Sequence, residues 1–265
     1  MASMTYAVTG ILQLRVRMRS GDVRIERATD DRATVTIAGA RDPGEVSIEH
    51  DAAERGTRLE VTQRKDGWGF RGRTVDATIA VPVGATVDVG TSSGDVRVEV
   101  EVANAHVQSG SGDVFVERVT EDARVRSASG DVQIDEVGGD LTVTTASGDI
   151  TVGSVGGHLE TRTASGDVEV AATTGSTRMA SGSGDISIAS AGSTVWLRTV
   201  SGDIAVGVPM GMRVWFDVSS TSGDAVSELD VGAEGDAGAD FEIVATSVSG
   251  DIRIRRAPER AVSTA

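Results

Sequence analysis

The sequence predicts an all-β protein, folded as a right-handed parallel β-solenoid with about 18 residues per coil and a cap at each end. Three observations lead to this prediction. Ser-Gly-Asp occurs ten times, and its seven copies from Ser93 to Ser201 are spaced by 18 residues without exception. The residues after each aspartate alternate between apolar and variable positions with the period of a strand. No segment shows the 3.6-residue apolar rhythm of a helix.

The first strand of each repeat follows the aspartate directly. Two columns of β-branched residues lie one and three positions after it. The first column is Val96, Val114, Val132, Ile150, Val168, Ile186 and Ile204, and the second is Val98, Val116, Ile134, Val152, Val170, Ile188 and Val206. The residues between the two columns share no chemistry, so we expect the β-branched pair to point inward and the middle residue to face solvent.

A second, weaker strand begins about ten residues after the aspartate. Its predicted inward pairs include Leu141 with Val143, Leu159 with Thr161, and Val195 with Leu197. Stacked coils would place equivalent residues about 4.8 Å apart, and parallel crossovers are overwhelmingly right-handed. The alternative is a meander of hairpins. The corners "VGGD", "VGGH" and "TTGS" are longer than the tight Asn-Gly turn, which argues against it.

The Ser-Gly-Asp triplet marks a corner between coils. Its glycine can adopt a positive φ, and its Ser and Asp side chains can accept backbone N–H groups. The predicted turn glycines are Gly94, Gly112, Gly130, Gly148, Gly166, Gly184 and Gly202. Stacking would align the aspartates in a column, where neighbouring carboxylates repel by about 1 kcal/mol in water. Backbone donors, Ser hydroxyls, interleaved arginines or a metal ion must therefore offset the repulsion.

Calcium is the alternative occupant of this column. The candidate ligands are Asp113, Asp131, Asp149, Asp167 and Asp185. Calcium takes six to eight oxygen ligands, and one carboxylate per coil supplies too few. We therefore predict no metal or other cofactor, and we expect EDTA to leave the melting temperature unchanged.

The repeats divide the chain into four predicted regions. Residues 1–90 form a strand-rich region of degenerate coils or a cap, 91–206 the regular repeats, 207–256 irregular C-terminal coils and a cap, and 257–265 a flexible tail. Trp68 and Phe70 stand in a polar, Gly-rich loop, which serves either as a contact site or as a cover for the open end of the solenoid. Trp215 and Phe216 stand where the repeat breaks down, as expected of a cap.

Composition excludes several functions. A formal net charge of -15 opposes binding to nucleic acid and to anionic lipid. The chain has no cysteine, which excludes disulfides and thiolate chemistry, and its three histidines form no catalytic motif. We expect no catalytic residues. With no secretory signal and no apolar stretch long enough to span a bilayer, we expect a cytoplasmic protein or one peripheral to the membrane.

Repeated "SGDVxV" and "SGDIxV", preceded by "VPVGATVDVGTSSGDV" from Val81 to Val96, resemble the DUF4097 β-strand-repeat family. This family is also called "putative adhesin" and is grouped with LiaG/YvlB-like toastrack domains. The likeness covers roughly Thr9 to Arg256. It implies a β-solenoid-like fold and a role in bacterial envelope-stress sensing or surface contact, and it brings no catalytic residues.

Together these observations predict a non-catalytic bacterial scaffold or binding module, acting in envelope-stress signalling or surface contact. Two alternatives stay open, a calcium-stabilised adhesin and a carbohydrate-active enzyme on a β-helix. The expected partner is an unidentified protein or envelope component, without nucleic acid and without direct membrane insertion. The open ends of the coil stack also predict end-to-end self-association.

Overall fold

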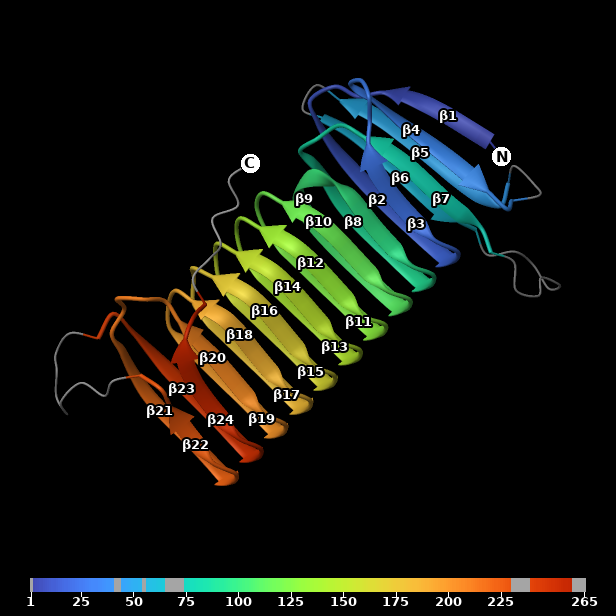
Figure 1. The fold of residues 1–265 in the computed structure, drawn as a ribbon. Coiled ribbons are helices and arrows are strands. Elements are labelled where there is room, and N and C mark those ends of the chain that lie inside the picture. The colour runs from blue at the N-terminus through green and yellow to red at the C-terminus, as the bar shows by residue number, and fades with distance from the viewer. Residues whose placement is uncertain (1, 41–43, 54–55, 65–73, 230–238, 259–265) are drawn as a thin grey trace. The chain divides into compact units, whose positions relative to one another are not determined.

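The computed structural model describes residues 2–40, 44–53, 56–64, 74–229 and 239–258. These residues form 24 strands and no helix, so none of them provides a helix that could cross a membrane. The predicted all-β solenoid with 18 residues per coil is confirmed, and the hairpin meander is wrong because the repeat strands pair in parallel (Figure 1). The chain divides into two compact units, Met1–Gly139 and Asp140–Ala265, each considered by itself below.

Each coil of the C-terminal unit contributes one strand to each of two stacks. The first stack holds β14 (Ile150–Val155), β16 (Val168–Thr173), β18 (Ile186–Ala191), β20 (Ile204–Val208), β24 (Ile252–Arg256) and β22 (Ala225–Ser227). The second holds β13 (Leu141–Ser147), β15 (Leu159–Ser165), β17 (Thr177–Ser183), β19 (Val195–Ser201), β23 (Phe241–Ser249) and β21 (Val214–Ser222).

Register within these stacks follows the 18-residue period. Ile150 pairs with Val168 and Leu159 with Thr177, each one repeat apart. The predicted inward side chains are buried; Ile150, Leu141 and Leu159 have exposed fractions of 0%. Because each coil offers only a few apolar residues, burial depends on stacking against the coils above and below.

The stacking order departs from the chain order at the C-terminal end. The coil made by β23 and β24 lies between the β19–β20 coil and the β21–β22 coil, although it comes last in the sequence. Trp215 and Phe216, the predicted cap residues, lie in the outermost strand β21, where Trp215 is 54% exposed and Phe216 is half-buried. The last described strand of the chain is thus paired on both edges.

The N-terminal unit has the same exchange of order. Its strands are β1 (Ala2–Ala7), β2 (Ile11–Ser20), β3 (Val23–Arg27), β4 (Arg32–Ala38), β5 (Val46–Ala53), β6 (Gly56–Gln63), β7 (Asp76–Val81), β8 (Ala85–Ser93), β9 (Val96–Ser111), β10 (Val114–Val119), β11 (Ala123–Ser129) and β12 (Val132–Val137). The coil of β2 and β3 lies between the β6–β7 coil and the β8–β9 coil. Antiparallel strands complete this unit, with β5 against β6, β4 against β7, and β1 against β4.

Val114 pairs directly with Val132, and both are 1% exposed, as the predicted stacking requires. One inward column, however, was not predicted. It consists of hydroxyl residues two positions before the serine of the triplet, and its buried members are Thr91, Ser109, Ser127, Thr145, Thr163, Ser181, Thr199 and Ser247. In several coils this hydroxyl donates a hydrogen bond to the carbonyl of that serine, as from Thr163 to Ser165 at 3.0 Å. These buried hydroxyl groups therefore stabilise the Ser-Gly-Asp corner from the interior of the coil.

Candidate functional site

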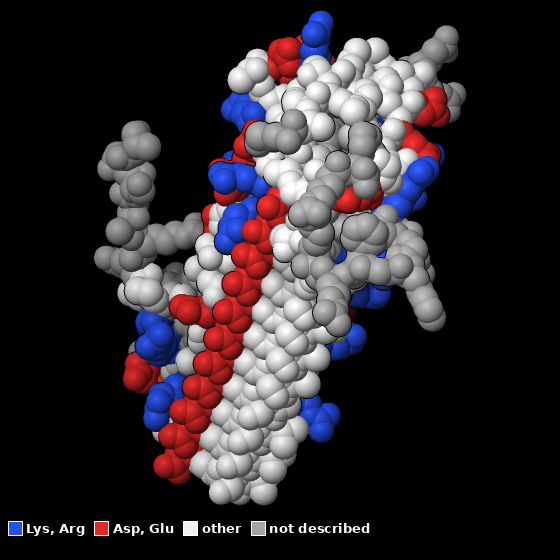
Figure 2. All heavy atoms as spheres, turned by 90° about the vertical axis from the view of Figure 1, so that its right-hand side faces the viewer, with Lys and Arg blue, Asp and Glu red and all other residues white. Residues whose placement is uncertain are grey.

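The aspartates of the triplets, together with Asp76, which belongs to no triplet, form a column in each unit, named here the aspartate ladder. In stacking order it comprises Asp76, Asp22, Asp95, Asp113 and Asp131 in the N-terminal unit, and Asp149, Asp167, Asp185, Asp203, Asp251 and Asp224 in the C-terminal unit. Within each unit, acidic side chains follow one another along a line on the surface (Figure 2).

A single hydrogen bond repeats along the ladder. The Oδ1 atom of one aspartate accepts the backbone N–H of the aspartate in the next coil, as from Asp185 to Asp167 at 2.8 Å and from Asp131 to Asp113 at 2.9 Å. The sequence predicted a backbone donor for these side chains, and the structure shows that the donor belongs to the neighbouring coil. The carboxylates therefore act as links between coils, which offsets their mutual repulsion.

The calcium candidates Asp113, Asp131, Asp149, Asp167 and Asp185 are all members of this ladder. Among the described residues, no group of three or more His, Asp or Glu side chains is placed to hold a metal ion. Each coil contributes one carboxylate, which is few for a cation that takes six to eight oxygen ligands.

The glycines of the triplets have two structural reasons to be glycine. At the seven predicted turn glycines φ lies between 113° and 143°, a region that other residues rarely adopt. The coils also approach closely at this corner. A Cβ atom at Gly166 would collide with the carbonyl oxygen of Gly148, and one at Gly184 with that of Gly166.

The other residues considered in the sequence analysis do not lie together in one site. Trp68 and Phe70, the predicted contact loop, lie outside the described residues. His50 stacks near Tyr6, with ring centroids 5.1 Å apart, and His158 Nδ1 lies 2.8 Å from the hydroxyl of Ser176. Only His106 lies in an extended polar network.

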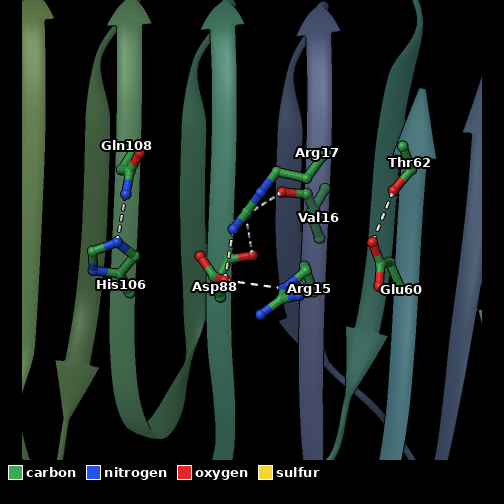
Figure 3. A network of polar contacts seen from close by, with 8 residues as sticks. All are labelled: Arg15, Val16, Arg17, Glu60, Thr62, Asp88, His106 and Gln108. Atoms are coloured by element: carbon green, nitrogen blue, oxygen red, sulfur yellow. Dashed lines mark hydrogen bonds and ion pairs between the residues drawn. The ribbon is translucent and has the colours of Figure 1, made fainter. Parts of the chain in front are cut away.

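That network lies on the outward face of four adjacent strands, β2, β8, the second half of β9, and β11. We name this surface the arginine face, because its outward residues include Arg15, Arg17, Arg19, Arg124 and Arg126. Strand pairing places Arg15 beside Asp88, Asp88 beside His106, and His106 beside Arg124. Segments far apart in the sequence thus form one surface (Figure 3).

Asp88 is the centre of the network. Its Oδ2 atom accepts hydrogen bonds from Arg15 at 3.2 Å and from Arg17 at 2.7 Å, and its backbone carbonyl accepts a second bond from Arg17 at 3.1 Å. The amide nitrogen of Gln108 lies 2.6 Å from Nε2 of His106. Nε2 of His106 accepts this amide N–H in the tautomer whose Nε2 carries no proton.

Two pKa values are shifted here. Partial burial acts to raise the pKa of Asp88, but the hydrogen bond and charge of Arg17, with smaller contributions from His106 and Arg15, hold this pKa below its ordinary value. Partial burial lowers the pKa of His106. The charge of Asp88 opposes this effect, and the nearby arginines add to it. At neutral pH the pair is therefore a carboxylate beside a neutral imidazole.

A shallow depression of about 620 Å³ lies at one end of the arginine face. Its lining includes Arg17, Arg19, Arg64, Gln63 and Gln108, and none of the described residues that line it is an aspartate or glutamate. Gly90 and Gly110 also line it, with the side chain of Arg17 beside Gly90 and the backbone of Ser92 beside Gly110. The charged side chains among the described residues that line the depression are all arginines, and its amides and hydroxyls can donate hydrogen bonds, so its chemistry suits an anion.

This site was not predicted, although part of its signal is local. "LQLRVRMRS" carries Arg15, Arg17 and Arg19 at alternate positions, which puts them on one face of a strand. The rest of the site depends on the pairing of β2 with both β6 and β8, which join residues tens of positions apart. No 18-residue period marks those pairs.

Comparison with known proteins identifies the family. The family model described as "Toastrack DUF4097" matches residues 11–255, and the chain belongs to that family. A crystal structure of a "putative lipid binding protein" from Parabacteroides distasonis is similar, with 13% identity, a TM-score of 0.50, and coverage of 95% of this chain and 96% of that one. A "putative adhesin" from Bacteroides fragilis shows 14% identity, a TM-score of 0.47 and 96% coverage of both chains. At these identities the likeness concerns the fold alone. No curated protein matches the chain.

Proposed function

We propose that this chain is a non-catalytic binding scaffold that serves bacterial envelope-stress signalling or surface contact. The observation that carries the proposal is the use of the repeated carboxylates. Each hydrogen bond of the aspartate ladder joins one coil to the next, so the repeated carboxylates stabilise the stack of coils. The outward positions of the strands carry the chemistry that differs from coil to coil, and they are held in rows on a stacked sheet. That arrangement suits recognition of a partner.

The geometry favours this proposal over the two alternatives. A glycoside hydrolase needs two carboxylic groups that face one bond of the substrate. Among the described residues, the lining of the depression includes neither aspartate nor glutamate. A calcium-stabilised adhesin needs several oxygen ligands at one point, and the ladder offers one aspartate per coil.

A complementation experiment tests the proposal. The gene is deleted in its bacterium, and survival is measured under an agent that damages the envelope and in a surface-contact assay. We expect a defect that the wild-type chain restores, and that Asp167→Asn/Asp185→Asn/Asp203→Asn restores equally, because asparagine keeps the acceptor oxygen of the ladder and removes the carboxylate.

Two results would contradict the proposal. One is a deletion strain without any defect in either assay. The other is an asparagine variant that folds normally but fails to complement, which would point to carboxylate chemistry or to bound calcium.

A further inference from the structure

We infer that the depression on the arginine face binds a phosphate-bearing small molecule, with Arg19, Arg64 and the side-chain amide of Gln63 as its principal donors. The inference rests on the proposed role of the chain as a binding scaffold, and it names the site and the chemical class of the ligand.

The first argument is an excess of positive charge on an acidic protein. The arginine face carries five arginines and one aspartate, an excess of four positive charges, on a chain whose formal net charge is -15. Arg15 and Arg17 are both paired with Oδ2 of Asp88. Over the described part of the chain, the guanidinium groups of Arg19 and Arg64 make no hydrogen bond or ion pair.

The backbone N–H of Arg64 donates to the carbonyl of Glu45, so one acidic residue lies beside Arg64. The other acidic side chains nearby lie on rows that do not pass through Arg17. Glu60 of β6 pairs in register with Arg15, and Asp51 of β5 pairs with Arg58. The row through Arg17 instead holds Thr62 on one side and Gly90 on the other. The row through Arg17 therefore holds no acidic side chain, and a bound anion would relieve the repulsion between Arg17 and Arg19.

The second argument is a donor that the backbone already orients. Oε1 of Gln63 accepts the backbone N–H of Arg19 at 2.7 Å and that of Ser20 at 3.3 Å. Since only the oxygen of an amide can accept, the assignment of oxygen and nitrogen in Gln63 is fixed. Its NH₂ group is left to donate at the lining of the depression. A ligand meets this amide without having to order it, which lowers the entropic cost of binding.

The third argument concerns the number and direction of the donors. Arg17 and Arg19 come from β2, Gln63 and Arg64 from β6 and the residue after it, and hydroxyl groups such as Ser92 from β8. A planar carboxylate has two oxygens, whereas a phosphate group has at least three acceptor oxygens in a tetrahedral arrangement. Donors that approach from several strands match the tetrahedral group better.

The source of the phosphate follows from the charge of the whole chain. A net charge of -15 opposes adsorption to an anionic bilayer, while a small anion reaches the depression without facing the rest of the surface. We therefore assign the site to a small phosphorylated compound, and a lipid headgroup becomes an outcome of the test.

Isothermal titration calorimetry on the full chain tests the inference, with pyrophosphate, inorganic phosphate and acetate as probes. We expect saturable binding of pyrophosphate, weaker binding of phosphate, and none of acetate. Arg19→Gln/Arg64→Gln should weaken pyrophosphate binding by about 100-fold, since each charge-assisted hydrogen bond contributes about tenfold. The matched control Arg27→Gln/Arg198→Gln removes the same charge from exposed arginines elsewhere, and it should change the affinity by less than about twofold.

Gln63→Glu is a second variant that preserves the local structure. Its carboxylate can still accept both backbone N–H groups but places a negative charge in the depression, so pyrophosphate binding should be lost. Absence of saturable binding to the wild-type chain, or equal binding by the wild-type chain and both site variants, would overturn the inference.

A vesicle arm separates the two sources of phosphate. Vesicles of phosphatidylcholine with and without phosphatidylglycerol are sedimented with the protein. Binding to the soluble probes without cosedimentation supports the small phosphorylated ligand. Arginine-dependent cosedimentation without binding of the soluble probes overturns that choice in favour of a lipid headgroup. Failure of all probes with intact complementation rejects this inference alone, whereas arginine-dependent binding in a chain whose deletion causes no defect rejects the proposed function alone.

Discussion

Replacement of Asp167 separates the structural role of the aspartate ladder from a role in binding. Its Oδ1 atom accepts the N–H of Asp185 at 2.8 Å, and its own N–H donates to Asp149 at 2.9 Å. Asp167→Asn keeps an acceptor oxygen and removes the charge. Asp167→Ala removes both, and it leaves the N–H of Asp185 to be satisfied by water.

The expected magnitudes follow from this geometry. A hydrogen bond to a charged acceptor contributes about 1.5–3 kcal/mol, and an exposed bond lies at the low end because water competes for the donor. Repulsion from each neighbouring carboxylate, at a strand spacing of about 4.8 Å, costs about 0.9 kcal/mol in water and about half of that at physiological salt. The lost charge assistance and the relieved repulsion nearly cancel in Asp167→Asn. We therefore expect its free energy of unfolding to be close to wild type, and that of Asp167→Ala to be about 1 kcal/mol lower than that of the asparagine variant.

Urea unfolding followed by circular dichroism measures these differences, and Glu169→Gln serves as the control because it removes an exposed negative charge outside the ladder. The wild type should gain more stability from added salt than Asp167→Asn does. Equal loss of stability in the asparagine and alanine variants would refute the acceptor role. A rise in the melting temperature of the wild type with calcium, reversed by EDTA, would show that the ladder holds a metal.

Three further predictions follow from the described residues. Thr161→Val should raise the free energy of unfolding by about 1–2 kcal/mol, because the Thr161 hydroxyl is fully buried without a hydrogen-bond partner, and unchanged stability would contradict that burial. Deletion of residues 150–167 joins Asp149 to Val168 and restores the triplet register, so this variant should keep the β-sheet circular dichroism and a cooperative transition, whereas deletion of residues 150–158 should abolish both. The pKa values of Asp88 and His106 are both lowered on folding, so each group binds fewer protons in the folded state and stability should fall as the pH falls. As the pH falls, the loss of stability due to His106 begins at the ordinary pKa of histidine and ends below the lowered pKa of His106, and His106→Gln should remove this loss. The loss of stability due to Asp88 begins at the ordinary pKa of aspartate, in the acid range, and Asp88→Asn should remove it. A pH profile of urea midpoints that neither variant alters would contradict both assignments.

The repeat made most of the solenoid predictable from sequence. An exact 18-residue period implies that equivalent residues meet, and Val114 does pair with Val132. The same period does not indicate the order in which the first and last coils stack. Asp22 follows the triplet pattern like any other coil, but its coil packs against that of Asp95, 73 residues away. Local sequence does not indicate such an exchange, because the strands of every coil present nearly the same backbone edge for pairing.

The candidate site was predictable only in part. Alternation alone puts Arg15, Arg17 and Arg19 on one face, and that signal is present in the sequence. Their relation to Gln63 and Asp88 required the pairing of β2 with β6 and with β8. The buried hydroxyl column was also readable, since a Ser or Thr stands two positions before the serine in each regular coil. Its role became clear only from the bond that it donates to the corner.

Amide chemical-shift mapping of the full chain, titrated separately with pyrophosphate and with calcium, tests most directly which surface binds a ligand and which one only stabilises the stack of coils. We predict that pyrophosphate shifts the amides of Arg17, Arg19 and Gln63 in a saturable manner, and that calcium produces no saturable shift along the aspartate ladder. Saturable calcium shifts at Asp167 and Asp185, with the amides of the arginine face unmoved by pyrophosphate, would contradict the assignment of both surfaces.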